Sequence, residues 1–105
     1  MKIECRTDNE KHERTYLIEG ELDVHEVKTL KSNLLADLEK GGEWSFIIDF
    51  TGVKYLDSSG LGMLVYLKKT IDRQGGKLLI VHLNEQVKNV FKLTKLESYF
   101  GLSLE

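Results

Sequence analysis

The sequence predicts a small α/β fold, in which a mixed β-sheet packs against about three α-helices. Two short alternating segments near the N-terminus predict an antiparallel hairpin, because only a polar turn separates them. Two nearly continuous apolar segments follow, residues 44–50 and 77–83, with a helical pattern between them. A strand, a helix and a second strand of this length form a right-handed parallel crossover. We therefore expect a hairpin followed by parallel strands, in a single domain over residues 1–105.

The hairpin is expected to pair residues 3–7 with residues 15–19, because both segments alternate apolar and polar side chains. The stretch from Gly20 to Asp23 then leads into the first helix. Asp23 is a candidate N-cap, and Glu26 three residues later completes an acidic variant of the capping box. One face of this helix carries the apolar residues Val27, Leu30, Leu34 and Leu38, and two glycines at 41–42 end it.

Residues 44–50 combine aromatic and β-branched side chains in a nearly continuous run, which is typical of a central strand covered on both faces. The chain is then expected to turn at Gly52 and again at Asp57. A helix with an apolar stripe should follow, because apolar residues recur at helical spacing. The stripe consists of Leu61, Leu64, Val65 and Ile71, widened by Met63 and Leu67.

After the strand at 77–83, Asn84 is expected to cap a third helix. Its predicted packing stripe consists of Val87, Val90, Phe91 and Thr94. A short last strand is expected at 102–104.

The composition is that of an ordinary globular protein, with 41% hydrophobic and 30% charged residues. Seventeen acidic and fifteen basic side chains give a formal charge of −2, which argues against a direct nucleic-acid partner. No apolar run approaches the roughly 20 residues of a membrane span, and the charged N-terminus does not resemble a signal peptide. The single cysteine, Cys5, excludes an intramolecular disulfide. We expect a cytoplasmic protein without a membrane partner.

The candidate site is the turn that contains Asp57, Ser58 and Ser59. All three residue types cap helix starts, so a hydroxyl is expected at the positive end of a helix. The turn before Asn84 should lie at the same edge, beyond the carboxyl ends of the parallel strands, where α/β sheets bind ligands. Simple capping is the structural alternative. Gly60 and Gly62 favour a function beyond capping, because glycine in a first helical turn indicates close approach of a neighbouring backbone or a partner.

Catalytic functions find little support in the sequence. Ser58 has Leu56 two residues before it, so the Gly-x-Ser-x-Gly elbow of hydrolases is incomplete, and His82 is expected in a strand. A phosphate-binding loop of the Gly-x-x-x-x-Gly-Lys-[Ser/Thr] type is absent. Histidine, cysteine and carboxylate residues are not spaced as metal ligands. We expect no enzyme activity, no metal and no cofactor.

Two motifs resemble those of a known family. The stretch Leu56-Asp57-Ser58-Ser59-Gly60-Leu61-Gly62, after a strand ending in Asp49-Phe50, is similar to the signature of STAS-domain anti-sigma factor antagonists. The upstream Gly20-Glu21-Leu22-Asp23 is similar to the family's second motif. The resemblance covers about residues 3–104 and implies the STAS fold.

The resemblance also implies a function. The unphosphorylated protein would bind an anti-sigma factor that is also a serine kinase, and thereby free a sigma factor for transcription. The kinase would phosphorylate Ser58, a serine phosphatase would reverse this, and Ser59 is the competing acceptor. The implied partner-binding residues are Asp23, Asp57, Ser59, Gly60, Leu61, Gly62, Met63 and Asn84.

A second function remains open at this point. Related STAS domains are parts of anion transporters and subunits of lipid-transport complexes, where they act as scaffolds through constitutive protein contacts. Such a domain would carry a serine that is never phosphorylated. The intact Asp57-Ser58 pair favours the switch over the scaffold.

Overall fold

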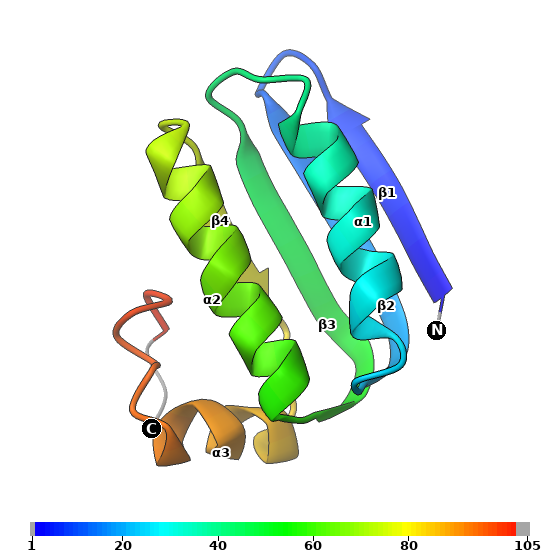
Figure 1. Ribbon diagram of the computed structural model, residues 1–105, viewed down its shortest axis with the longest axis vertical. Coiled ribbons are helices and arrows are strands. Elements are labelled where there is room, and N and C mark those ends of the chain that lie inside the picture. The colour runs from blue at the N-terminus through cyan, green and yellow to red at the C-terminus, as the bar shows by residue number, and fades with distance from the viewer. Residues whose placement is uncertain (1, 103–105) are drawn as a thin grey trace.

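The computed structural model describes residues 2–102, which form one mixed sheet and three helices. The strands are β1 (Lys2–Asp8), β2 (Glu13–Leu22), β3 (Ser45–Leu56) and β4 (Lys77–Val81). The helices are α1 (Val27–Leu38), α2 (Ser58–Arg73) and α3 (Glu85–Leu93). The predicted fold class is confirmed, since the hairpin and the parallel strands follow in the expected order (Figure 1).

The sheet has the strand order β1-β2-β3-β4. β1 and β2 are antiparallel, with Ile3 opposite Ile18, whereas β2, β3 and β4 are parallel. Each parallel pair is connected by one helix, α1 between β2 and β3 and α2 between β3 and β4. This is the crossover that the strand–helix–strand pattern predicts.

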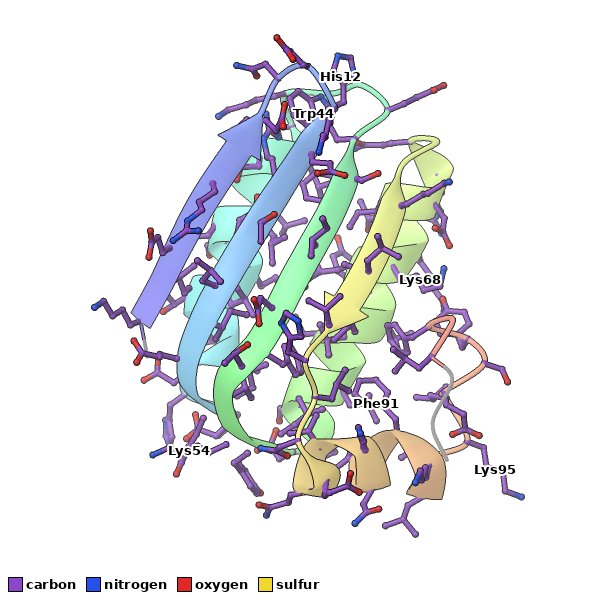
Figure 2. The ribbon with its side chains drawn as sticks, turned by 180° about the vertical axis from the view of Figure 1, so that it is seen from behind. His12, Trp44, Lys54, Lys68, Phe91 and Lys95 are labelled. Atoms are coloured by element: carbon purple, nitrogen blue, oxygen red, sulfur yellow. The ribbon has the colours of Figure 1, made fainter. Side chains whose placement is uncertain are left out.

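The helices α1 and α2 lie on one face of the sheet only (Figures 1 and 2). The expectation that β3 is covered on both faces is therefore wrong. Its inner residues Phe46, Ile48 and Phe50 are buried against the helices, whereas Ile47 on the outer face is half-buried. Leu79, the neighbour of Ile47 on β4, is 46% exposed. β3 is thus a central strand between β2 and β4, with helices on one face only.

The predicted turn at Gly52 is also wrong, because β3 continues through Gly52 to Leu56. The pairing of β2 with β3 shifts register on both sides of this position, between Leu17 and Glu19 and between Gly20 and Glu21. A Cβ atom on Gly52 would lie 2.8 Å from the backbone oxygen of Ile18. The glycine thus accommodates an irregular strand pair rather than a turn.

Other boundaries differ at the ends of elements. The strand β4 stops at Val81 instead of residue 83, because His82 takes a left-handed backbone conformation with φ of +60°. In α3, Val87 and Phe91 are buried as expected, but Thr94 is the exposed C-cap. Leu102 lies outside any strand, and the rest of the predicted strand at 102–104 falls outside the described residues.

The sheet edge at the amino ends of the parallel strands is held by side chains from several elements. The guanidinium of Arg14, which is only 7% exposed, donates to the backbone oxygen of Asp37 at 3.1 Å and lies over the ring of Trp44. The hydroxyl of Tyr16 donates to the carboxylate of Asp37. Trp44 also stacks on His12 (Figure 2). These contacts connect β2 to the end of α1 and to the segment before β3.

Candidate functional site

The candidate site lies at the opposite edge, where the parallel strands β2 and β3 end side by side. Leu22 and Leu56 are register partners, and an aspartate follows each of them. The N–H of Asp57 donates to the backbone oxygen of Leu22 at 3.4 Å. The turns that follow the two strands are therefore neighbours. They lie beyond the carboxyl ends of parallel strands, where α/β sheets bind ligands.

Asp57 is the N-cap of α2. Its Oδ1 atom accepts hydrogen bonds from the N–H groups of Ser59 at 2.9 Å and Gly60 at 3.1 Å, and its backbone oxygen accepts from Leu61 at 3.0 Å. The side chain thus binds two N–H groups that lack partners within the helix, and the backbone oxygen accepts the first helical hydrogen bond. The predicted capping role of Asp57 is confirmed.

Ser58 is the first residue of α2 and is exposed, whereas Ser59 is half-buried. The sequence could not distinguish the two hydroxyls by exposure. In the structure, Ser58 presents the more accessible side chain at the positive end of a 16-residue helix. This arrangement suits a reversible modification of Ser58 or a direct contact with another protein.

The two glycines of the motif have different surroundings. A Cβ atom on Gly60 would lie 2.8 Å from the backbone oxygen of Leu22 and 2.5 Å from Cδ1 of Leu56, so this glycine lets α2 approach the ends of β2 and β3. Gly62 is exposed, and a Cβ atom there would meet nothing within 4 Å. The structure therefore explains Gly60 by packing and leaves a bare surface at Gly62.

Leu61 and Met63 do not form the expected docking surface. Their exposed fractions are 7% and 4%, and both side chains belong to the hydrophobic core. Gly60 is buried as well. The expected accessible surface at residues 60, 61 and 63 is therefore wrong. Helical periodicity turns these residues toward the sheet and leaves residues 58 and 62 outside.

Asp23 and Asn84 both accept backbone hydrogen bonds near the site, but only Asn84 is a helix N-cap, and the prediction of Asp23 as the N-cap of α1 is wrong because that position is Glu26. The Oδ1 atom of Asp23 accepts from the N–H groups of His25 and Glu26 at 3.0 Å each, in a turn that precedes α1, so the helix begins later than expected, at Val27. Asn84 is the N-cap of α3: its Oδ1 accepts from the N–H of Val87 at 2.8 Å, and its Nδ2 donates to the backbone oxygen of Val53 at 3.0 Å. Asn84 thus attaches α3 to β3.

A comparison with known proteins identifies the family. The family model described as STAS domain matches residues 6–105. The chain belongs to the STAS domain family. An anti-sigma-B factor antagonist of Bacillus subtilis (strain 168) is 33% identical over 86 residues, which are 82% of this chain and 77% of the relative.

Solved structures share the fold of this STAS domain. The anti-sigma factor antagonist SpoIIAA in its unphosphorylated form has a TM-score of 0.72 at 18% identity, over 88% of this chain and 83% of that chain. The phosphorylated form of SpoIIAA, from Bacillus, has a TM-score of 0.74 at 18% identity, over 99% and 93%. The murine anion transporter Slc26a9 matches 84% of this chain with only 14% of its own, at a TM-score of 0.73 and 19% identity.

Three exposed hydrophobic side chains belong to this part of the STAS domain and were missed in the sequence. Tyr66 is 46% exposed and lies two helical turns beyond Ser58, so Ser58, Gly62 and Tyr66 follow one line along α2. Val24, 58% exposed, follows Asp23 in its turn, and Tyr55, 41% exposed, precedes the cap Asp57. The sequence signals for them were the four-residue spacing from Ser58 through Gly62 to Tyr66, the position of Val24 directly after Asp23, and that of Tyr55 two residues before Asp57.

A polar pair outside the candidate site, Asp49 and His82, lies on the outer face of the sheet. The carboxylate of Asp49 accepts from the N–H and the hydroxyl of Thr51 at 2.9 and 2.6 Å and lies 3.0 Å from Nδ1 of His82. Partial burial raises the pKa of Asp49, but these hydrogen bonds outweigh it and hold that pKa below its usual value. His82 is therefore engaged with Asp49 at the surface, and this pair is explained by local hydrogen bonding.

Within residues 2–102, no cluster of three or more histidine, cysteine or acidic side chains is arranged to hold a metal ion. None of the described helices is long and apolar enough to cross a membrane.

Proposed function

We propose that this chain is an anti-sigma factor antagonist controlled by phosphorylation of Ser58. The unphosphorylated form binds an anti-sigma factor that is also a serine kinase, and phosphorylation abolishes this binding. A serine phosphatase restores the active form. The observation that carries the proposal is the exposed hydroxyl of Ser58 directly after the cap Asp57, in a chain whose Bacillus subtilis relative is an anti-sigma-B factor antagonist.

The accessibility of the two hydroxyls supports Ser58 over Ser59 as the acceptor. A kinase must enclose the hydroxyl that it modifies, and Ser58 is exposed whereas Ser59 is half-buried with its N–H bound to Asp57. The bare surface at Gly62, one turn further along α2, leaves room for a protein to approach Ser58 closely.

The capping geometry suggests how a phosphate would act. Asp57 already accepts hydrogen bonds from the N–H groups of residues 59, 60 and 61. A phosphate on Ser58 would therefore not be needed as their acceptor and could stay at the surface. It would add about −1.5 to −2 charges next to Asp57, in a turn that neighbours the turn of Asp23. The domain should remain folded, while its surface becomes too negative for a partner that binds the neutral serine.

The test is phosphorylation of the purified protein by a candidate kinase encoded in the same genome, followed by peptide mass spectrometry and binding titrations. Ser58→Ala is expected to bind the kinase under all conditions and to accept no phosphate. Ser58→Glu is expected to fold normally and bind at least about tenfold more weakly, because it adds a charge at the docking surface. Ser59→Ala is the matched control and should retain both phosphorylation and binding.

Equal affinities of Ser58→Ala and Ser58→Glu would overturn the switch. A phosphate on Ser59 in the wild-type protein would keep the mechanism and move the site. Protein recovered from its native cell should carry the phosphate in a fraction that changes with growth conditions.

A scaffold function is the second candidate, since a domain of the anion transporter Slc26a9 shares the fold. In that case the chain would act through constitutive contacts. It would be recovered unmodified under every condition, and Ser58→Glu would leave its partner contacts intact.

A further inference from the structure

The strand β1 forms an open edge of the sheet. It is the outermost strand next to β2, and apart from Ile3 its residues are exposed (Figure 2). At the other edge, a surface depression is lined by Leu78 and Leu79 of β4 together with Tyr99 and Phe100 of the C-terminal segment, so that segment flanks β4. An open strand edge presents unpaired N–H and C=O groups that can pair with another strand.

The outward side chains of β1 alternate in charge. Lys2, Glu4, Arg6 and Asp8 occupy every second position and therefore share one face, since Ile3 and Cys5 pair with the buried residues Ile18 and Tyr16.

Pairing with β2 does not account for this alternation. Glu4 lies opposite Leu17, Arg6 lies opposite Thr15, and Asp8 lies opposite the like-charged Glu13. Only Lys2 faces an opposite charge across this strand pair, on Glu19. Within one copy, Arg6 contacts Glu4 at 3.5 Å, but both side chains are more than half exposed, so this pair contributes little to stability.

The order of the charges is complementary to itself when the strand is reversed. If two copies of β1 pair antiparallel with Cys5 opposite Cys5, Lys2 of each copy faces Asp8 of the other and Glu4 of each copy faces Arg6 of the other. All four charge pairs are then attractive, and cross-strand pairs of opposite charge stabilise a sheet.

Other registers are disfavoured by the same charges. A shift by two residues in one direction sets Glu4 against Glu4 and Lys2 against Arg6. A shift in the other direction sets Arg6 against Arg6 and Glu4 against Asp8. Like charges directly opposite each other destabilise strand pairing. A shift by four residues has no like-charge pair but keeps only two attractive pairs over three residues, so the register with Cys5 opposite Cys5 is favoured.

We propose that β1 is a self-complementary edge through which two copies of this chain associate into one continuous sheet. The two-fold axis passes beside Cys5, and both helix layers lie on the same side of the joined sheet. Because the joined strands run antiparallel, the two Ser58 surfaces lie at opposite ends of the dimer and both remain open. The contact involves seven residues from each copy, so the dimer is weak and depends on concentration.

The test uses sedimentation equilibrium of the full chain over a range of concentrations at low salt. The wild-type protein is expected to approach twice the monomer mass as its concentration rises, and to dissociate at high salt because the charge pairs are exposed. Glu4→Arg should weaken dimerisation about tenfold or more, since two of the four pairs turn from attraction to repulsion. Arg6→Glu should have the same effect.

Two matched experiments separate charge pairing from general disruption of β1. The double variant Glu4→Arg, Arg6→Glu should regain wild-type dimerisation, because the attractive pairs return with their signs exchanged. An equimolar mixture of the two single variants should form a mixed dimer with about wild-type affinity, although each variant alone dimerises more weakly. A short bismaleimide should link Cys5 to Cys5 only in the samples that dimerise, because Cys5 is exposed and is the chain's single thiol.

A wild-type protein that stays monomeric at every concentration would overturn the proposal. So would dimerisation that the single variants leave unchanged, or loss of dimerisation that neither the double variant nor the mixture restores. Circular dichroism of each variant shows whether the fold is intact.

Discussion

The two turns that follow β2 and β3 are built alike and end differently. In each, an aspartate Oδ1 accepts from the N–H groups two and three residues ahead, after strands whose last residues are register partners. After Asp57 the helix begins at once with Ser58. After Asp23 the chain makes a further turn, and α1 begins only at Val27, with Glu26 at the N-cap position.

The difference shows that the cap alone does not place an exposed hydroxyl at the start of a helix. At α2 the first helical residue carries an exposed hydroxyl, and the first turn of the helix contains no acidic residue. At α1 the same kind of cap leads to Glu26 and Val27. Gly60 brings α2 against Leu22 so that the helix can start directly at the strand end.

The largest effect is expected from Gly60→Ala. The added methyl group would lie 2.8 Å from the backbone oxygen of Leu22, so α2 must shift away from the turn at Asp23. We expect a loss of about 2 kcal/mol in the free energy of unfolding, measured by urea denaturation, because overpacking outweighs the gain in helix propensity. Wild-type stability would show that the two turns do not depend on this close approach.

Removal of the caps should have a smaller effect that differs between the turns. Asp57→Ala is expected to cost about 1 kcal/mol, since it leaves two N–H groups of α2 without their acceptor. Asp23→Ala should cost less, because that carboxylate caps a turn ahead of α1 rather than the helix itself. Equal losses in denaturant titrations of the two variants would remove the distinction between the turns.

Gly62→Ala is expected to stabilise the protein by about 0.5 to 1 kcal/mol. The site has open space for a methyl group, and alanine has the higher helix propensity. The same variant should weaken binding of the proposed partner if that partner approaches Gly62. Thermal denaturation and a binding titration of one preparation separate these effects, and a loss of stability would contradict the open surface.

The smallest effect on stability is expected from Ser58→Glu. A negative charge at the first position of α2 interacts favourably with the helix dipole, so the free energy of unfolding should rise by a few tenths of a kcal/mol. Charge-neutral Ser58→Gln is the control. A clear destabilisation by the glutamate alone would mean that a phosphate at this position disturbs the fold as well as the surface.

Local patterns predicted the order of the elements and the caps at Asp57 and Asn84 correctly. Capping and helical periodicity are interactions between residues close in sequence, so a single sequence contains them. Helical periodicity also placed Leu61 and Met63 in the apolar stripe of α2, where the structure buries them, whereas the family resemblance implied that both contact a partner.

Features that depend on distant contacts could not be read from the sequence. The extension of β3 through Gly52 depends on the irregular pairing with β2, and the position of both α1 and α2 on one face depends on the handedness of two crossovers. The different surroundings of Gly60 and Gly62 follow from how α2 sits on Leu22. Two glycines in one motif gave no sign of this difference.

The contact of Trp44 with Arg14 and His12 makes the chain's single tryptophan a useful fluorophore. It lies at the sheet edge opposite the start of α2, where it joins β2 to the segment before β3. Its emission should change when the whole domain unfolds and stay constant when a ligand protein occupies the surface around Ser58. One optical signal can therefore report folding independently of complex formation, without an attached dye.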